Sequence, residues 1–232
     1  MGLGVLGWHT LLQQKGLAFD SFPSMMLNAR IFSQMKEEPE KATEILALEF
    51  GEPEWCQGFN RRNLTCLAIA PTMSNSIISG GMSAGIEAIN SNAYALKSAK
   101  GTFIRKNKQL EIILEMRGKN TIEVWDKIIK AGGSVQDLDC LTTEEKEIFK
   151  TAREINQFAV INQAAQRQKF IDQGQSVNLF MSAGVSAKYV NQVHLHAWEQ
   201  GLKSLYYIRT ESVLKGSKVY EYDKSDCVSC EG

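Results

Sequence analysis

The stretch from residue 168 to residue 210 constrains the fold most, because it predicts a strand, a helix and a second strand in succession. Residues 176–180 form a short β-like segment, and Gly184 supplies a turn after it. An amphipathic helix then begins at Ser186, and residues 203–208 form a second β-like segment. This order of elements predicts a β-α-β unit and therefore an α/β fold.

Two adjacent tyrosines, Tyr206 and Tyr207, close this unit. Consecutive side chains of a strand point to opposite faces, so we expect one ring to be buried while the other faces a partner or a cleft. Aromatic residues are common in strands and cores, and packing is the simplest interpretation of the pair. Stacked phenols can also relay an electron and a proton in short steps, since a phenol that gives up an electron must lose its proton.

A hydroxyl-rich turn at residues 71–76 predicts either a phosphate site or a helix cap. Its sequence is Pro-Thr-Met-Ser-Asn-Ser, and the apolar residues 63–70 before it are short enough for a buried strand. Unpaired N–H groups at a helix start, the helix dipole and hydroxyl donors together favour an anion. Alternatively, Thr72 or Ser74 simply caps the helix. The spacing alone does not separate the two interpretations.

The remaining periodic segments predict scaffold helices. Apolar residues recur at three- and four-residue intervals, and Pro39 is expected to break or open a helix. A Thr-x-x-Glu capping box at Thr142 opens a helix that can extend through residues 162–168. Residues 110–116 fit a helix or a strand equally. The predicted helices cover residues 8–16, 24–50, 121–130 and the stretch that begins at 142.

The glycines at positions 2, 4 and 7 satisfy the G-x-G-x-x-G pattern of dinucleotide-binding proteins. That pattern requires a preceding strand, which nothing before Gly2 provides, so we do not expect a dinucleotide site. The favoured interpretation is a close-packed start of a helix, where small residues let backbones approach.

Composition indicates a soluble globular protein without a strong electrostatic preference. Lys plus Arg and Asp plus Glu number 26 each, which gives no field to attract nucleic acid or an anionic membrane. No apolar run is long enough to span a membrane. Five cysteines suit a reducing cytoplasm better than a disulfide framework, so we expect a cytoplasmic protein.

Residues 211–232 are polar and predict a flexible tail that ends in Cys227-Val-Ser-Cys230. A C-x-x-C pair forms a dithiol or half of a zinc site, but the three histidines lack the paired spacing of a zinc finger. We therefore expect no metal. From Ile208 to Cys227 the tail can span at most roughly 60 Å when extended and about 25 Å as a flexible coil.

Four motifs occur in the order found in class I ribonucleotide reductase large subunits, which this chain resembles. They are the Asp-Gln-Gly-Gln-Ser-Val-Asn run at 172–178, the segment 194–207 with its paired tyrosines, the turn at 71–76 and the C-terminal C-x-x-C. The resemblance implies that residues 1–210 are the C-terminal part of a ten-stranded α/β barrel and that residues 211–232 are a flexible redox tail.

The resemblance also implies roles for individual residues. Tyr206 and Tyr207 would relay oxidising equivalents from a metal-containing small subunit that bears a radical. Cys227 and Cys230 would carry electrons from thioredoxin or glutaredoxin by thiol–disulfide exchange. The residues that would hold the diphosphate of a ribonucleoside diphosphate substrate are Thr72, Met73 through its backbone, Ser74, Asn75 and Ser76. No cofactor is implied for this chain itself.

The chain departs from the resembled family in two ways. Ala88-Ile89 stands where family members often carry proline. The Asn-Leu-Cys-x-Glu motif of the radical-bearing cysteine is absent, since the nearest run, Asn63-Leu-Thr-Cys66, has one residue too many and no glutamate. We interpret Cys66, Cys56 and Cys140 as structural.

These departures predict that another polypeptide supplies the reacting cysteines. In the resembled family the glycine run lies well inside the chain, so its place at residue 2 leads us to expect a large subunit split into two pieces, as in some bacteriophages. The N-terminal fragment of the large subunit and the small subunit would then be partners. The alternative is a non-catalytic module that docks the small subunit or a thioredoxin-like protein.

Overall fold

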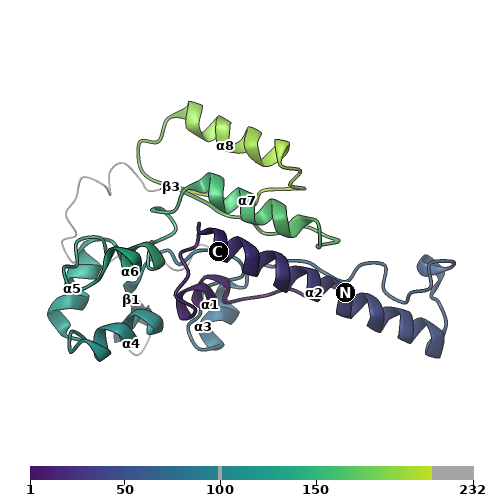
Figure 1. Cartoon of the computed structure of the whole chain (residues 1–232), viewed down its shortest axis with the longest axis horizontal. Helices are drawn as coiled ribbons and strands as arrows, with labels where there is room; N and C mark the ends of the chain where they lie inside the picture. Colours follow the sequence, from purple (N-terminus) through teal and green to yellow (C-terminus); the bar gives the residue numbers. More distant parts are fainter. Residues whose placement is uncertain (99–100, 211–232) are drawn as a thin grey trace.

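The computed structural model describes residues 1–98 and 101–210. The long helix α2 (Phe22–Phe50) lies beside α7 (Gln157–Gln168), and α8 (Ala187–Glu199) packs on the opposite side of α7 (Figure 1). The short helices α1 (Trp8–Gln14) and α3 (Met73–Ile78) lie beneath this layer. The largest core joins α1, α2 and α7 to the extended segments between them, with Trp8, Phe32 and Ile69 buried in it.

The β-α-β prediction is confirmed, with shifted bounds. Strand β3 (Leu179–Met181) pairs in parallel with β4 (Ile208–Thr210), and α8 connects them. The Ser186 hydroxyl accepts a hydrogen bond from the Tyr189 N–H and so caps α8 as expected. The side chain of Asn178 accepts a hydrogen bond from the backbone N–H of Tyr207, and the regular pairing of the two strands begins at the next residue, Leu179.

Residues 63–70 are extended but form only isolated bridges. Leu67 pairs with Leu3, and Ile69 pairs with Gln175, both in parallel. The predicted buried strand is therefore an extended segment that lies between the N-terminal segment on one side and the segment around Gln175 on the other. Cys66, Leu67 and Ile69 of this segment lie in the main core, which agrees with the sequence pattern, whereas Leu64 is exposed.

The close-packed helix start predicted for the glycine run is confirmed. Gly7 precedes α1 with a φ of 84°, a conformation that glycine adopts without strain. A Cβ atom on Gly4 would lie 2.4 Å from the carbonyl oxygen of Ala68. Only glycine at position 4 lets the N-terminal segment pair this closely with residues 63–70.

Two expectations about helices are wrong. Helix α2 runs unbroken through Pro39, which is only partly buried, so water can reach the carbonyl that the ring leaves unpaired. The helix that begins after Thr142 ends early: α6 (Thr143–Ile148) has the expected capping box, but α7 is a separate helix. Between them Phe149, Ala152 and Ile155 are buried, and this anchors an irregular segment.

Residues 93–149 form a second core that the sequence predicted only in part. An antiparallel hairpin of β1 (Ala93–Ser98) and β2 (Gly101–Lys106) leads into α4 (Lys108–Met116), so residues 110–116 are helical. Helix α5 (Ile122–Lys130) matches its prediction, and its Trp125 packs with Leu110 of α4. The hairpin was not among the elements expected from the sequence.

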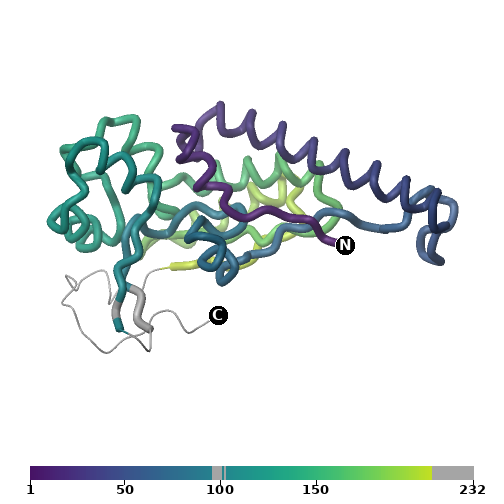
Figure 2. The backbone as a smooth tube through the Cα atoms, turned by 90° about the horizontal axis from the view of Figure 1, so that it is seen from below, coloured from purple at the N-terminus to yellow at the C-terminus, as the bar shows by residue number. Residues whose placement is uncertain are grey.

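Helix α2 extends past the other helices and carries an apolar arm. Figure 2 shows α2 running along one side of the molecule and projecting beyond it together with the loop that follows, which contains the short 3-10 helix η1 (Glu54–Cys56). Exposed apolar side chains of the arm are Ile45, Leu48, Phe50, Trp55 and Phe59. Among the residues that the structure describes, no helix is long and apolar enough to cross a membrane.

Candidate functional site

The rings of Tyr206 and Tyr207 contact each other in a tilted arrangement immediately before β4. Their ring centroids lie 4.1 Å apart with an interplanar angle of 47°. Tyr206 is 49% exposed and Tyr207 is 53% exposed, so the expectation that one ring would be buried is wrong. The pair precedes β4 instead of lying within it, so the alternation of a strand does not apply. Contact between the rings is the geometry that a relay of short steps requires.

The surroundings of the pair fix its backbone and shift one phenol. The N–H of Tyr206 donates to the carbonyl of Val177 at 2.9 Å, and the N–H of Tyr207 donates to the side-chain oxygen of Asn178 at 3.0 Å. The guanidinium of Arg209 lies 5.7 Å from the centroid of the Tyr207 ring. Hydrogen bonding with Tyr207 raises the pKa of the Tyr206 phenol. The main chain of both residues is therefore tied to the segment before β3.

The predicted turn at residues 71–76 lies at the start of a helix, as expected, but α3 already begins at Met73, so residues 73–76 form its first turn. Thr72 has a φ of 48° and makes no side-chain cap, because its hydroxyl oxygen instead accepts from the N–H of Gly85 at 2.8 Å. Ser76 is buried and its hydroxyl donates to the carbonyl of Met73. The side chains of Ser74 and Asn75 are exposed. The cap interpretation of Thr72 is therefore wrong, and two polar side chains of the turn face outward.

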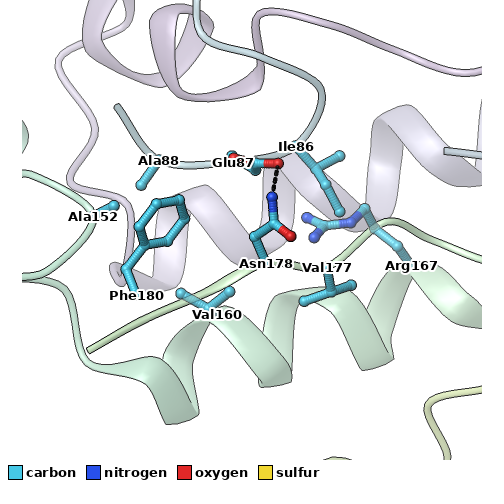
Figure 3. Close-up of a pocket in the computed structure, with 9 residues that line it drawn as sticks. All are labelled: Ile86, Glu87, Ala88, Ala152, Val160, Arg167, Val177, Asn178 and Phe180. Carbon is cyan, nitrogen blue, oxygen red and sulfur yellow. Dashed lines mark hydrogen bonds between the residues drawn. The ribbon is translucent and has the colours of Figure 1, made fainter. Parts of the chain in front are cut away.

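A buried carboxyl group that the sequence analysis did not single out lies between this turn and the tyrosines. Figure 3 shows Glu87 and Asn178 pointing toward each other in a pocket that Arg167 also lines. The amide nitrogen of Asn178 donates to Glu87 Oε1 at 2.7 Å. Burial raises the pKa of Glu87 to about 7, and the charge of Arg209 and the bond from Asn178 oppose this rise. A lone glutamate in the apolar run at 84–89 was the available clue.

Arg167 is fully buried and is held by neutral groups. Its Nη1 donates to Asn28 Oδ1 at 2.9 Å, and its Nε donates to Gln175 Oε1 at 3.2 Å. The guanidinium lies 5.5 Å from the centroid of the Phe32 ring. Burial lowers the pKa of Arg167 to about 9. The side chain joins α7 to α2 and to the segment before β3.

The internal cysteines have structural environments. Cys66 and Cys56 are buried, and burial is the main cause that raises the pKa of the Cys66 thiol. Cys140 is half-buried and packs against the second core. A thiol with a raised pKa is a poor nucleophile, which agrees with the structural interpretation of Cys66.

Two of the predicted site residues, Cys227 and Cys230, lie outside the described residues, as does the whole predicted tail at 211–232. Within residues 1–98 and 101–210, no group of three or more His, Cys, Asp or Glu side chains is arranged to hold a metal ion.

Comparison with known proteins gives the class of this fold. The family model described as "Ribonucleotide reductase, barrel domain" matches residues 56–208. The chain therefore belongs to the ribonucleotide reductase family, and its α/β fold is a portion of that barrel.

Within the family, the chain is similar to large subunits. It is 42% identical to the ribonucleoside-diphosphate reductase large subunit of Invertebrate iridescent virus 6 over 94% of this chain and 23% of the relative. It is 38% identical to that of Invertebrate iridescent virus 3 over 100% of this chain and 38% of the relative. Among solved structures, the class Id ribonucleotide reductase alpha subunit of Actinobacillus ureae matches with a TM-score of 0.85 and 49% identity, over 91% of this chain and 39% of that chain. The chain thus spans less than half the length of these relatives.

Proposed function

We propose that this chain is the C-terminal piece of a ribonucleoside-diphosphate reductase large subunit and takes part in the radical reduction of ribonucleotides to deoxyribonucleotides. The observation that carries the proposal is the contact of the Tyr206 and Tyr207 rings at 4.1 Å on an accessible surface. A partner can reach one phenol, and the second phenol is within one short step of the first.

The two phenols would act in sequence. Oxidation of one phenol removes an electron and the O–H proton together, and the neighbouring phenol then returns both and becomes the radical. The oxidising equivalent would come from the metal-containing small subunit and would pass to a cysteine of the large subunit. The contact of the two rings, with centroids 4.1 Å apart, keeps each of these steps short.

Substrate would be held by the start of α3 and by Thr72 just before it. The exposed side chains of Ser74 and Asn75, the buried hydroxyl of Ser76 and the backbone of Thr72 and Met73 surround the start of this helix. The first N–H groups of the helix have no side-chain cap. Uncapped N–H groups and hydroxyl donors are suited to the diphosphate of a ribonucleoside diphosphate.

A separate N-terminal polypeptide would supply the cysteine that forms the thiyl radical. The sequence has no Asn-x-Cys-x-Glu motif, and the thiol of Cys66 is buried with a raised pKa. The apolar arm of α2 and its following loop is suited to bind that polypeptide, since large exposed apolar patches mark interfaces. Trp55 at 81% exposure is the arm's most prominent aromatic side chain.

The test is co-purification of this chain from its native cells, followed by mass spectrometry. An N-terminal reductase fragment with the cysteine motif supports the split subunit, whereas recovery of both parts in one polypeptide contradicts it. If this chain is recovered alone, or only with a thioredoxin-like protein, the catalytic role is contradicted and the chain is a binding module. Trp55→Ser should weaken co-purification of the fragment, while Ile122→Ser, an equally exposed site on α5, should not.

A further inference from the structure

Three hydrogen bonds and the short covalent segment from Gly85 to Glu87 join the turn at Thr72 to the backbone of Tyr207. The Thr72 hydroxyl accepts from the N–H of Gly85 at 2.8 Å. Two residues later, Glu87 Oε1 accepts from the Asn178 amide nitrogen at 2.7 Å. The amide oxygen of Asn178 accepts from the N–H of Tyr207 at 3.0 Å. Both ends of one amide group are therefore used, so the amide cannot rotate without losing a bond.

The short segment between Gly85 and Glu87 is held rigidly. Gly85 has a φ of 42°, and a Cβ atom there would lie 2.9 Å from the carbonyl oxygen of Ala70. The N–H of Glu87 closes a turn onto the carbonyl of Ala84 at 2.9 Å. Ile86 between them is buried. A displacement of Gly85 therefore moves the Glu87 carboxyl with it.

Burying the Glu87 carboxyl and the Asn178 amide costs desolvation free energy, and filling the same space with apolar side chains would not. Glu87 is 7% exposed and Asn178 is 3% exposed, and the rest of their pocket is mostly apolar (Figure 3). An apolar pair of similar volume would fill this space without the desolvation of a carboxyl group. A polar contact in such a place is suited to fix one orientation of its neighbours.

We propose that Glu87 and Asn178 are positioning residues that couple occupancy of the turn at Thr72 to the position of Tyr207. The inference rests on the proposed function, since it takes the turn as the phosphate site and the tyrosines as the relay. A diphosphate that draws Thr72 toward itself shifts Gly85, and the shift reaches the Tyr207 backbone through Glu87 and Asn178. The relay geometry then depends on whether substrate is bound.

The experiment places 3-fluorotyrosine at position 207 of the assembled complex and follows its ¹⁹F resonance during titration with ADP. In the unsubstituted protein the resonance should move and saturate with ADP binding. Glu87→Leu keeps the volume but removes the acceptor, so most of this movement should vanish while the Kd for ADP changes by less than about threefold. Glu87→Gln keeps an acceptor oxygen and should restore the movement.

Turnover gives a second readout that a merely structural role would not reproduce. Glu87→Leu should lower kcat by ~10- to 100-fold with little change in KM, because small misplacements of reacting groups are costly. Glu87→Gln should recover most of this loss. Asn92→Ala is the matched control, since it removes a buried amide that donates to the carbonyls of Gly133 and Phe149 in the second core. It should leave the ADP-induced movement intact.

The outcomes separate this inference from the proposed function. If ADP does not bind, the phosphate turn is wrong and the coupling is wrong with it. If ADP binds but the resonance does not move, or moves equally in Glu87→Leu, the coupling is wrong while the phosphate turn stands. If Glu87→Leu does not fold, the pair variant Glu87→Leu/Asn178→Leu replaces both buried partners. It also removes the acceptor of the Tyr207 N–H, so the whole path is broken and the ADP-induced movement should again vanish.

Discussion

Position 87 shows how burial sets the chemistry of a single residue. The carboxyl lies in a mostly apolar pocket, so its charged form is disfavoured and its pKa rises from 4.5 to about 7. Arg209 and Asn178 favour the charged form but do not cancel the burial. The group therefore binds a proton more tightly in the folded protein than in the unfolded chain.

Glu87→Gln should change how stability depends on pH. A raised pKa in the folded state means that the contribution of Glu87 to the free energy of unfolding is fully present below pH ~4.5 and is lost as pH rises through ~7. The loss amounts to roughly 3 kcal/mol. Since glutamine does not titrate, urea unfolding from pH 5 to pH 8 should show the variant gaining on the unsubstituted protein. Parallel stability curves would contradict the raised pKa.

Tyr206→Phe and Tyr207→Phe should each abolish nucleotide reduction by the assembled complex. Phenylalanine cannot form a neutral radical by losing an O–H proton, yet it keeps the ring contact. Both side chains are about half exposed, so stability should change by less than about 0.5 kcal/mol. Turnover and urea unfolding are the measurements, with Tyr189→Phe in α8 as the control. If turnover persists in both variants, the relay role of the two tyrosines is contradicted.

At the scale of elements, close backbone contact decides where the N-terminal segment lies. Gly4 passes so near to Ala68 that a methyl group would overlap a carbonyl oxygen. The isolated bridge between Leu3 and Leu67 depends on this approach. One small residue thus joins the chain's first segment to residues 63–70, which lead into the turn at Thr72.

Gly4→Ala should destabilise the protein by about 1–3 kcal/mol, because the new methyl group would lie 2.4 Å from a backbone atom that cannot move away cheaply. Gly174→Ala is the matched control. Its new methyl group would meet nothing nearer than 3.7 Å, and its φ lies outside the region that favours glycine. Equal unfolding midpoints in urea for the two variants would show that the contact is not tight.

At the scale of the whole molecule, the described part is an incomplete barrel. The chain covers 23% to 39% of the relatives compared with it, its parallel sheet of β3 and β4 has two strands, and the arm of α2 exposes apolar side chains. Exposed apolar surface and unpaired strand edges favour assembly with another polypeptide. Assembly is therefore the condition under which activity should be measured.

Replacing Cys227 and Cys230 with Ser should block turnover that is driven by thioredoxin while sparing turnover driven by a small dithiol. A small dithiol can reach a buried disulfide directly, whereas thioredoxin requires a carrier. Steady-state rates of the assembled complex with each reductant are the measurement, and Cys140→Ser serves as the control. Equal rates with both reductants would overturn the shuttle.

Local patterns in the sequence determined the kinds of elements but not always their limits. The caps at Ser186 and Thr142 and the apolar period of α5 are set by residues a few positions apart, so they could be read directly. The continuity of α2 through Pro39 could not be predicted from the sequence, because it depends on how exposed the helix is at Pro39. The motifs at 71–76, 172–178, 194–207 and 227–230 indicated the family, which the family model over residues 56–208 confirms.

Only the tertiary structure decided what those motifs touch. The hydrogen bond between Asn178 and Glu87 joins residues 91 positions apart. The Thr72 hydroxyl, which the sequence suggested as a helix cap, instead accepts from the N–H of Gly85. The contact between the two tyrosine rings, and the bond from the Tyr207 N–H to the Asn178 side chain, were likewise visible only in the structure. Side-chain periodicity is a local property that sequence encodes, whereas burial and partner choice arise where distant segments meet.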